Sequence, residues 1–277
     1  MKALFIAPSS HEPCLIVQAW NSFNEPAVHR IFDVWGEPDD EGILNTARDT
    51  APDVIFYVGA NKASGLPSID TLCELRTIAS SVHLCWDAAD DGWKETLRSY
   101  KGCFDLQVAL DGVLSPLVDM ATLTPVDPRP YMSDTPRRVR CAFSGQNAGR
   151  AALGQYQHPR YTMLNYLVRK GLVEYHPRTD SSYEDYAEYL KSCRMLVNFS
   201  HTGSGLKHHC KVRITEAGMA GCALLEMVEA PTRDWIPEEC LFIYRGVEDA
   251  AEMIQTMDST ERIRKAAALK EHVWENY

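Results

Sequence analysis

Apolar runs and amphipathic stretches alternate along the chain, and each type predicts a different element. Short continuous apolar runs predict strands that are buried on both faces. They lie at residues 3–7, 53–59, 81–87, 104–110, 139–145, 172–176, 194–200 and 223–228. A further apolar run covers residues 28–35. Stretches that predict helices lie at residues 41–51, 68–80, 93–102, 161–171, 182–193 and 247–277, and Ser68 is expected to cap the second of them.

The order of these elements, strand then helix with short connections, is typical of a parallel, doubly wound sheet. Residues 124–138 interrupt this order, because they contain four prolines and no apolar periodicity. We therefore expect an α/β protein with two Rossmann-like domains, at residues 1–123 and 139–277, joined by a linker at residues 124–138. Since such domains bind ligands at the carboxyl ends of their strands, a central cleft between them is the expected place for a site.

Composition describes an ordinary globular protein and argues against some functions. Of the 277 residues, 45% are hydrophobic and 24% are charged, which is enough for a large core. The net charge of −10 argues against a protein that coats nucleic acid or an anionic membrane, although a local basic patch remains open. The N-terminal apolar run is too short for a signal peptide, and no stretch approaches a membrane span. The nine cysteines form no CxxC pair, which predicts reduced, mostly buried thiols in a cytoplasmic protein.

Residues 211–226, KVRITEAGMAGCALLE, place a single carboxylate at the head of a run of small residues. Glu216 and Arg213 share a face if the segment is a helix, and the small residues permit close approach of a sheet or a ligand. The predicted helix start and the loop before it form a candidate anion site with Gly205, Lys207 and Arg213. The two oxygens of Glu216 suit a vicinal diol such as a ribose, which predicts a bound nucleotide. The alternative is a helix-start glutamate that pairs with Arg213.

This segment and its neighbours resemble the C-terminal domain of GT-B glycosyltransferases. The resemblance is carried by residues 186–200, 212–226 and 242–254, and it is closest to the CgeB-like group and its relatives in glycosyltransferase families 1 and 4. Those proteins have an R-x-x-E-A-x-x-x-G segment at this place. It matches Arg213, Glu216, Ala217 and Gly221.

Two further stretches carry the same resemblance. Residues 143–145, followed by Arg150 or Arg160, resemble the turn that opens the C-terminal domain of these enzymes. Residues 84–91, LCWDAADD, resemble a strand end with tryptophan and aspartate in their N-terminal half. The resemblance therefore covers roughly residues 50–277, and it is strongest in the second half of the chain.

The resemblance implies a GT-B fold and a glycosyltransferase with a nucleotide-sugar donor, for which we expect a UDP-sugar. Glu216 would hold the ribose hydroxyls, while Arg213 and Lys207 would face the diphosphate. Because the leaving diphosphate gains charge in the transition state, fixed cations stabilise it without a metal or another cofactor. The other donor-binding residues that we expect are Gly145, Arg150, Gly205 and His208.

The chain departs from the family pattern at one of these positions. Many retaining members have a second glutamate eight residues before the first, where this chain has His208. Whether the transfer retains or inverts the anomeric configuration therefore stays open. His208 also belongs to a group with His201, His209 and Cys210, whose spacing matches no standard zinc motif. We expect no metal there, and instead a contact between one of these histidines and the donor phosphates.

An inverting transferase needs a base for the acceptor hydroxyl, and the first domain offers two candidates at predicted strand ends. Asp87 ends the apolar run at residues 81–87, and His11 lies in the loop after the first strand. Asp87 ranks first because the resemblance reaches it. For each residue, the alternative is a loop side chain that caps the next helix. The loop at residues 59–65 has neither a GxGxxG nor a GxxxxGKS pattern, so dinucleotide binding is not supported.

Three functions remain open on the sequence. The first is a metal-independent glycosyltransferase that acts on a hydroxyl of a small molecule, a glycan, a protein or a hydroxymethylated DNA base. Contact with DNA would use the arginines near the linker, Arg129, Arg137, Arg138 and Arg140. The second is a GT-B-fold protein that binds a nucleotide or a partner without catalysis, which the departure at His208 favours. The third is a sugar-phosphate epimerase of the same fold, for which the sequence offers no assignable set of catalytic carboxylates and histidine.

Overall fold

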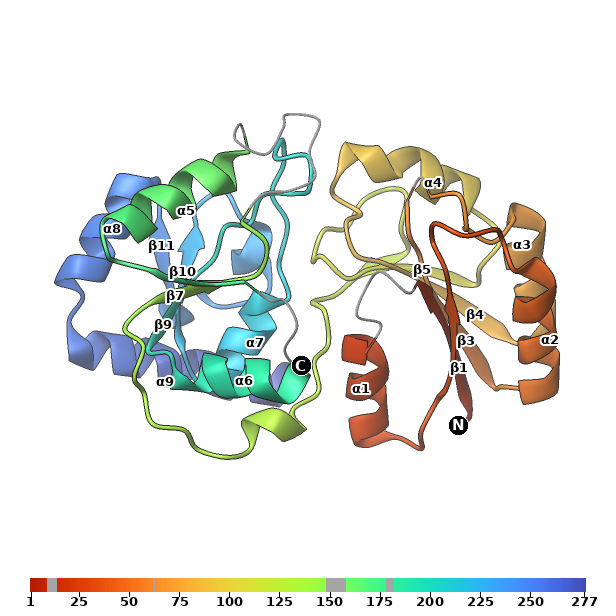
Figure 1. Ribbon diagram of the computed structural model, residues 1–277, viewed down its shortest axis with the longest axis horizontal. Helices are drawn as coiled ribbons and strands as arrows, with labels where there is room; N and C mark the ends of the chain where they lie inside the picture. Colours follow the sequence, from red (N-terminus) through yellow and green to blue (C-terminus); the bar gives the residue numbers. More distant parts are fainter. Residues whose placement is uncertain (9–13, 62, 148–157, 178–181) are drawn as a thin grey trace. The chain divides into compact units, whose positions relative to one another are not determined.

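The protein consists of two compact α/β units, Met1–Asp127 and Pro128–Tyr277. A computed structural model describes residues 1–8, 14–61, 63–147, 158–177 and 182–277 (Figure 1). The boundary between the units lies inside the proline-rich residues 124–138. No helix in these described ranges is long and apolar enough to cross a membrane.

The first unit is built on one parallel sheet. In its described part the sheet has six strands in the order β2-β1-β3-β4-β5-β6. These strands are β1 (Ala3–Pro8), β2 (Val28–Phe32), β3 (Val54–Val58), β4 (Ser80–Cys85), β5 (Leu106–Ala109) and β6 (Met120–Ala121). The helices are α1 (Cys14–Phe23), α2 (Asp40–Thr50), α3 (Ile69–Ile78) and α4 (Lys94–Ser99), and Ser68 caps α3 by accepting a hydrogen bond from Thr71 N.

The alternation of side chains along β1 divides the core of this unit into two layers. Leu4 and Ile6 pack with residues of α2 and α3, whereas Phe5 packs with Ile16 of α1. Figure 1 shows α1 on one face of the sheet and α2 and α3 on the other. The sheet is therefore covered on both faces, which is why its strands are nearly continuous apolar runs in the sequence.

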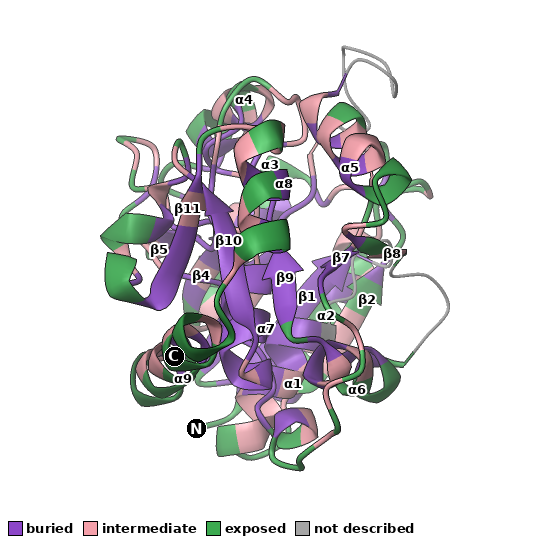
Figure 2. Cartoon of the chain, turned by 90° about the vertical axis from the view of Figure 1, so that its left-hand side faces the viewer, coloured by how far each residue is buried: buried purple, intermediate pink, exposed green. Residues whose placement is uncertain are grey.

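The second unit has the same construction. In its described part the sheet has five parallel strands in the order β11-β10-β9-β7-β8. They are β7 (Ala142–Ser144), β8 (Glu174–His176), β9 (Met195–Val197), β10 (Ala223–Met227) and β11 (Leu241–Tyr244). The helices are α5 (Pro159–Arg169), α6 (Tyr183–Ser192), α7 (Arg213–Ala220), α8 (Val247–Thr256) and α9 (Ser259–Asn276). Figure 2 shows β9 and β10 buried and the outer sides of α5 and α9 exposed.

The strand order of the second unit reverses between β7 and β9. The chain goes from β7 outward to the edge strand β8 and then returns to form β9 on the other side of β7. The connections that follow β7 and β9 therefore start toward opposite sides of the sheet. A space for a ligand opens between them, at the carboxyl ends of the two strands. In open α/β sheets this switch point is the usual place of a ligand.

The small residues of α7 lie against another helix. A Cβ atom on Gly218 would come within 2.3 Å of Val273 Cγ2 on α9, so glycine permits the close approach of the two helices. Gly221 ends α7 in the left-handed conformation, with φ 66°. We expected the small residues to face a sheet or a ligand. Gly218 instead faces α9, because the C-terminal helix packs on the outer side of α7.

The elements agree with the sequence prediction in most places, but α1, β6 and β11 were not predicted. The start of α1 is a continuous apolar run, and such a run shows no period that separates a helix from a strand. The helix predicted over residues 247–277 is two helices, α8 and α9. They separate where Asp258 caps the second helix by accepting a hydrogen bond from Glu261 N.

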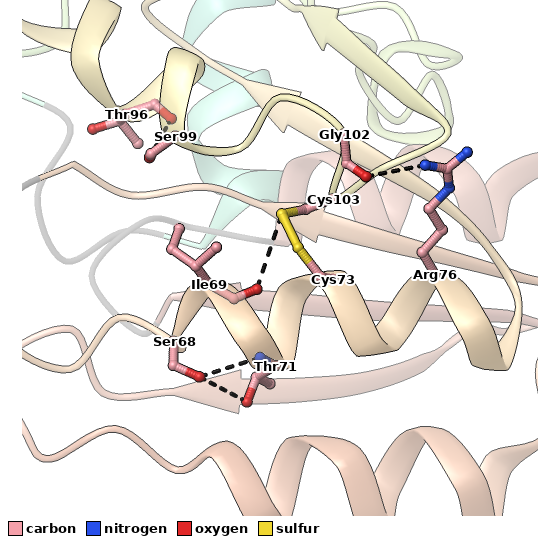
Figure 3. The surroundings of a disulfide bond; sticks show 9 residues. All are labelled: Ser68, Ile69, Thr71, Cys73, Arg76, Thr96, Ser99, Gly102 and Cys103. Carbon is pink, nitrogen blue, oxygen red and sulfur yellow. Dashed lines mark hydrogen bonds between the residues drawn. A yellow bond between two sulfur atoms is a disulfide. The ribbon is translucent and has the colours of Figure 1, made fainter.

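The prediction of reduced cysteines was wrong for one pair. Cys73 on α3 and Cys103 in the turn before β5 form a disulfide, and 30 positions separate them in the sequence (Figure 3). Only the packing of α3 beside that turn brings the two residues together, so their spacing carries no signal. The other cysteines with a described side chain are buried and form no disulfide within the described residues, at positions 85, 141, 193, 210, 222 and 240.

Candidate functional site

A buried arginine stands at the switch point of the second sheet. Arg213 is the first residue of α7, and its side chain is only 9% exposed. Its Nη1 donates a hydrogen bond of 2.9 Å to Oδ1 of Asn198, the residue directly after β9. Its guanidinium also lies 4.4 Å from the ring centroid of Phe143 in β7. The residues at the ends of β7 and β9 thus hold one cation in place.

Gly145, directly after β7, makes room for this cation. A Cβ atom at this position would lie 2.7 Å from Nη2 of Arg213, which is closer than side-chain contacts allow. Its φ of 114° also lies in the region that favours glycine. The structure therefore brings together two residues that we expected to bind the donor, Gly145 and Arg213.

A fully buried carboxyl group, Glu226, completes this network. Asn198 Nδ2 donates to Oε2 of Glu226 over 2.8 Å, and Ser200 Oγ donates to Oε1 over 2.7 Å. Burial raises the pKa of Glu226, while the hydrogen bonds from Ser200 and Asn198 act in the opposite direction. Neither Asn198 nor Glu226 was predicted from the sequence as a site residue. The available signal was one acidic residue inside the apolar strand ALLEMV, which is rarely buried without a role.

Glu216 lies one turn of α7 beyond Arg213 and is also fully buried. It accepts a hydrogen bond of 3.0 Å from the hydroxyl of Tyr186 on α6. Tyr131 lies nearby: burial raises its pKa well above the usual value, and the charge of Glu216 adds to that rise. Tyr131 and Tyr183 share a hydrogen bond of 3.1 Å between their hydroxyls. A tyrosine cluster therefore surrounds the carboxylate that we expected to bind a ribose.

The loop before α7 folds back on itself. His201 and His208 form an antiparallel bridge, and their ring centroids are 4.8 Å apart. Thr202 N donates to Lys207 O over 2.8 Å, and Gly205 adopts a left-handed φ of 75° between them. The side chain of Lys207 is exposed, whereas His201 is buried.

Burial lowers the pKa of two histidines in this loop, His201 and His208. Burial lowers the pKa of His201 to about 3, and the neighbouring His208 and Arg160 lower it further. Arg160 is itself buried and donates to the carbonyl oxygens of His201 and Gln146, at 2.9 and 3.2 Å. In the ranges that the structure describes, no group of three or more His, Cys, Asp or Glu side chains is placed to hold a metal ion.

In the first unit, Asp87 is half-buried and lies two residues after the end of β4. The neighbouring Asp90 caps the next turn, since its side chain accepts a hydrogen bond of 3.1 Å from Gly92 N. Asp111, which follows β5 and is buried, accepts a hydrogen bond of 2.9 Å from Ala89 N. Burial raises the pKa of Cys85, and the charges of Asp111 and Asp87 add to the rise, so both carboxylates lie near this strand end. The other base candidate, His11, lies outside the described residues, as does Arg150.

The arginines near the linker have different surroundings. Arg137 Nη2 donates to the carbonyl oxygens of Ala220 and Gly221 at the end of α7, over 2.6 and 2.9 Å. Arg140 Nη2 donates over 2.8 Å to Ile254 O near the end of α8. Cations at these positions donate hydrogen bonds to the terminal carbonyl groups. They also interact favourably with the negative C-terminal end of the helix dipole. The remaining two, Arg129 and Arg138, are exposed.

The model of the family described as "Glycosyl transferase-like" matches residues 137–277. No curated protein sequence matches the chain.

Solved structures match along nearly the whole chain. HepE of Anabaena in complex with UDP-glucose is 13% identical, with a TM-score of 0.66, and the match covers 99% of this chain and 95% of HepE. Sucrose-phosphate synthase of Thermosynechococcus elongatus is 11% identical, with a TM-score of 0.61 and coverage of 99% and 94%. A glycosyltransferase of Rickettsia africae is 10% identical, with a TM-score of 0.61 and coverage of 100% and 94%. The two parallel α/β sheets are those of the GT-B fold.

Proposed function

The chain belongs to the glycosyl transferase-like family, and from that premise we propose that it transfers a sugar from a UDP-sugar to a hydroxyl acceptor. Within the family, the R-x-x-E-A-x-x-x-G residues support a place near the CgeB-like group. We propose that the transfer requires neither a metal nor a cofactor, since a protein cation can stabilise the leaving diphosphate. The complexes of HepE with UDP and with UDP-glucose support the choice of nucleotide.

The observation that carries this proposal is the state of Arg213. Its guanidinium is buried at the switch point, and its Nε has no hydrogen-bond partner within the described part of the chain. A buried N–H group without a partner is costly, and a phosphate oxygen would satisfy it. Arg213 is therefore our candidate for the group that contacts the diphosphate and stabilises its developing charge.

Glu216 is our candidate for the ribose contact. It lies on the same short helix as Arg213, one turn further on, so the diphosphate and the ribose of one nucleotide would meet successive parts of α7. The Tyr186 hydroxyl already occupies one of its oxygens. Because Glu216 is fully buried, a ribose reaches it only when the groups that cover it move.

The other expected residues take supporting roles in the proposal. Lys207, exposed on the folded-back loop, would approach the diphosphate from outside, with His208 and Gly205 on the same loop. Asp87 remains the first choice for the base and His11 the second. We keep the acceptor as a hydroxyl on a small molecule, a glycan or a hydroxymethylated DNA base. Since Arg137 and Arg140 cap helices, contact with DNA would fall mainly to Arg129 and Arg138.

The experiment is a calorimetric titration with UDP, together with release of UDP from UDP-glucose in the presence of EDTA. We expect Arg213→Gln to weaken UDP binding by at least about tenfold, since a charge-assisted contact is lost. Arg138→Gln is the matched control, because this arginine lies in the same unit and is exposed. We expect the control to bind UDP like the wild type and UDP release to persist in EDTA.

A second arm of the same titration tests Glu216. Wild type should prefer UDP to its 2′,3′-dideoxy analogue, and Glu216→Ala should bind both ligands equally weakly. Equal UDP affinity in wild type and Arg213→Gln would contradict the proposed diphosphate site. Binding of UDP without release from any UDP-sugar would favour the alternative of a non-catalytic nucleotide-binding protein.

A further inference from the structure

We propose that Asn198 and Glu226 are positioning residues, which together aim the Arg213 guanidinium at the donor diphosphate without neutralising its charge. The inference rests on the proposed function, because it concerns the same site. It assigns a role to a buried acidic side chain that no step of the proposed transfer uses.

Glu226 is a fixed acceptor whose hydrogen bonds are saturated. Each of its oxygens accepts two hydrogen bonds. The donors are Ser200 Oγ at 2.7 Å and Met227 N at 2.8 Å for Oε1, and Asn198 Nδ2 at 2.8 Å and Thr232 Oγ1 at 2.9 Å for Oε2. A buried carboxyl group with this many partners has a single orientation.

This acceptor selects one orientation of the Asn198 carboxamide. Its Nδ2 donates to Glu226 and also to Ser200 Oγ, at 3.0 Å, so its Oδ1 points to the other side. That side is occupied by Arg213 Nη1, 2.9 Å away. The reversed amide would set oxygen against the carboxyl group and an N–H group against the guanidinium, so both contacts would become repulsive.

The backbone of Asn198 is held as well. Its N donates to Leu225 O over 2.8 Å, and its carbonyl oxygen accepts a hydrogen bond from the hydroxyl of Tyr244. Both partners are fully buried, and Asn198 itself has no exposed surface. The amide therefore acts as a rigid connection between the carboxyl group and the guanidinium.

The use of an amide between the two charges has a physical consequence. A carboxylate bonded directly to Arg213 would form an ion pair, and a diphosphate would then compete with it for the same N–H groups. A neutral amide oxygen accepts a hydrogen bond from one N–H of the guanidinium. The positive charge of the guanidinium then remains available to attract the diphosphate. Nε keeps an N–H group without a partner in the described residues, and Phe143 covers one face of the guanidinium.

The alternative role for Glu226 is purely structural: it joins the ends of β9 and β10 to the turn that contains Thr232. The two roles differ in what they do to Arg213. A structural role lowers stability and changes UDP affinity to the same extent whether or not position 213 is arginine. A positioning role acts through the guanidinium, so its effect on UDP affinity disappears when the guanidinium is removed.

The experiment is a double-mutant cycle of Glu226→Gln and Arg213→Gln, read out as the dissociation constant for UDP. Glutamine keeps the shape of Glu226 but turns an N–H₂ group toward Asn198 Nδ2 or Met227 N, which are both donors. We expect Glu226→Gln to weaken UDP binding about tenfold in wild type and less than about twofold in Arg213→Gln. Thr232→Val is the matched control, since it removes one hydrogen bond from Glu226 and leaves Asn198 in place.

Each outcome of this cycle either supports or overturns the positioning role. Equal effects of Glu226→Gln in both backgrounds, or none in either, would overturn the positioning role while the proposed function stands. A wild-type protein that binds no UDP would remove the proposed function and the inference with it. If Glu226→Gln does not fold, Asn198→Ala replaces it in the cycle, because Glu226 then keeps Ser200, Thr232 and Met227 N as partners.

Discussion

Arg213 obtains its surroundings from residues that are distant in the sequence. Phe143 contributes a ring on one side, Gly145 contributes space, and Asn198 contributes an acceptor. Phe143 and Asn198 bind no phosphate in our proposal, yet all three residues limit where the guanidinium lies. At the residue scale, the site is therefore the Arg213 guanidinium, whose position is fixed by residues at the ends of β7 and β9.

A substitution at Gly145 tests this arrangement. We expect Gly145→Ala to weaken UDP binding, because the new Cβ would lie 2.7 Å from Arg213 Nη2 and would force the guanidinium to move. The strained φ of 114° should also lower the free energy of unfolding by about 1–3 kcal/mol. UDP calorimetry and urea unfolding measure the two effects separately.

The matched control is Gly171→Ala in the same unit. Gly171 also has a left-handed φ, 67°, but a Cβ atom there would meet no atom within 4 Å among the described residues. The control should lose some stability and bind UDP like the wild type. Normal UDP binding by Gly145→Ala would show that Arg213 does not need this space.

At the scale of elements, α7 is a helix with no exposed side. Its described side chains are all buried, from Arg213 to Ala220. The loop before it and the end of β9 lie at its start, α9 packs on it at Gly218, and Arg137 caps its end. A helix held on every side can carry a charged residue at a fixed place, which a helix on the surface cannot do.

The close packing of α7 and α9 gives a second prediction. Gly218→Ala should lower the free energy of unfolding by about 1–3 kcal/mol, since its Cβ would overlap Val273. In the Val273→Ala background the same substitution should cost less, because the two Cγ atoms at 2.3 and 3.0 Å are removed and only the Cβ atom at 2.6 Å remains. Urea unfolding of the four proteins measures this coupling. Equal effects of Gly218→Ala in both backgrounds would show that the two helices do not meet at this point.

At the scale of the whole molecule, each unit contains a buried histidine. In the first unit, burial lowers the pKa of His83 to about 4, although a hydrogen bond with Gln107 opposes the shift. In the second unit, burial lowers the pKa of His201 to about 3. Both side chains are neutral in the folded protein at neutral pH, and both gain a proton more readily when the chain unfolds.

Acid should therefore destabilise both units. The unfolded state binds protons below pH 6.5, the usual pKa of histidine, whereas folded His83 does so only near pH 4. The free energy of unfolding is therefore highest above pH 6.5 and decreases as the pH falls. For His83 the decrease is about 2 kcal/mol at pH 5. Urea unfolding at pH 7 and pH 5 measures the loss, which His83→Gln should reduce. An unchanged pH dependence in this variant would exclude His83 as a cause.

The fold was largely predictable from the sequence because its main signals are local. Strands covered on both faces require continuous apolar runs, and the helices between them begin and end at caps such as Ser68 and Gly221. The start of α1 carried no period, and β6 has only two residues, so both were missed. The apolar run LFIY of β11 was a usable signal, since strands of three residues were predicted from similar runs. The disulfide between Cys73 and Cys103 was not predictable, since it depends on how α3 packs beside a distant turn.

The site was predictable only in part. The segment with Arg213 and Glu216 could be identified, because its residue types and spacing lie within one helix. Their surroundings could not be identified. The sequence shows Glu226 as an acidic residue in an apolar strand, but it does not show that Asn198 connects it to Arg213.

By itself, then, the sequence determined the α/β class, the order of elements and the segment that carries the charged residues. These features depend on periodicity, caps and spacing within short stretches of chain. The tertiary structure decided that β7 and β9 become neighbours, that their ends enclose Arg213, and that Glu216 is buried among tyrosines. Hydrogen bonds between strand ends depend on the order of strands in the sheet, and that order arises only when the chain is folded.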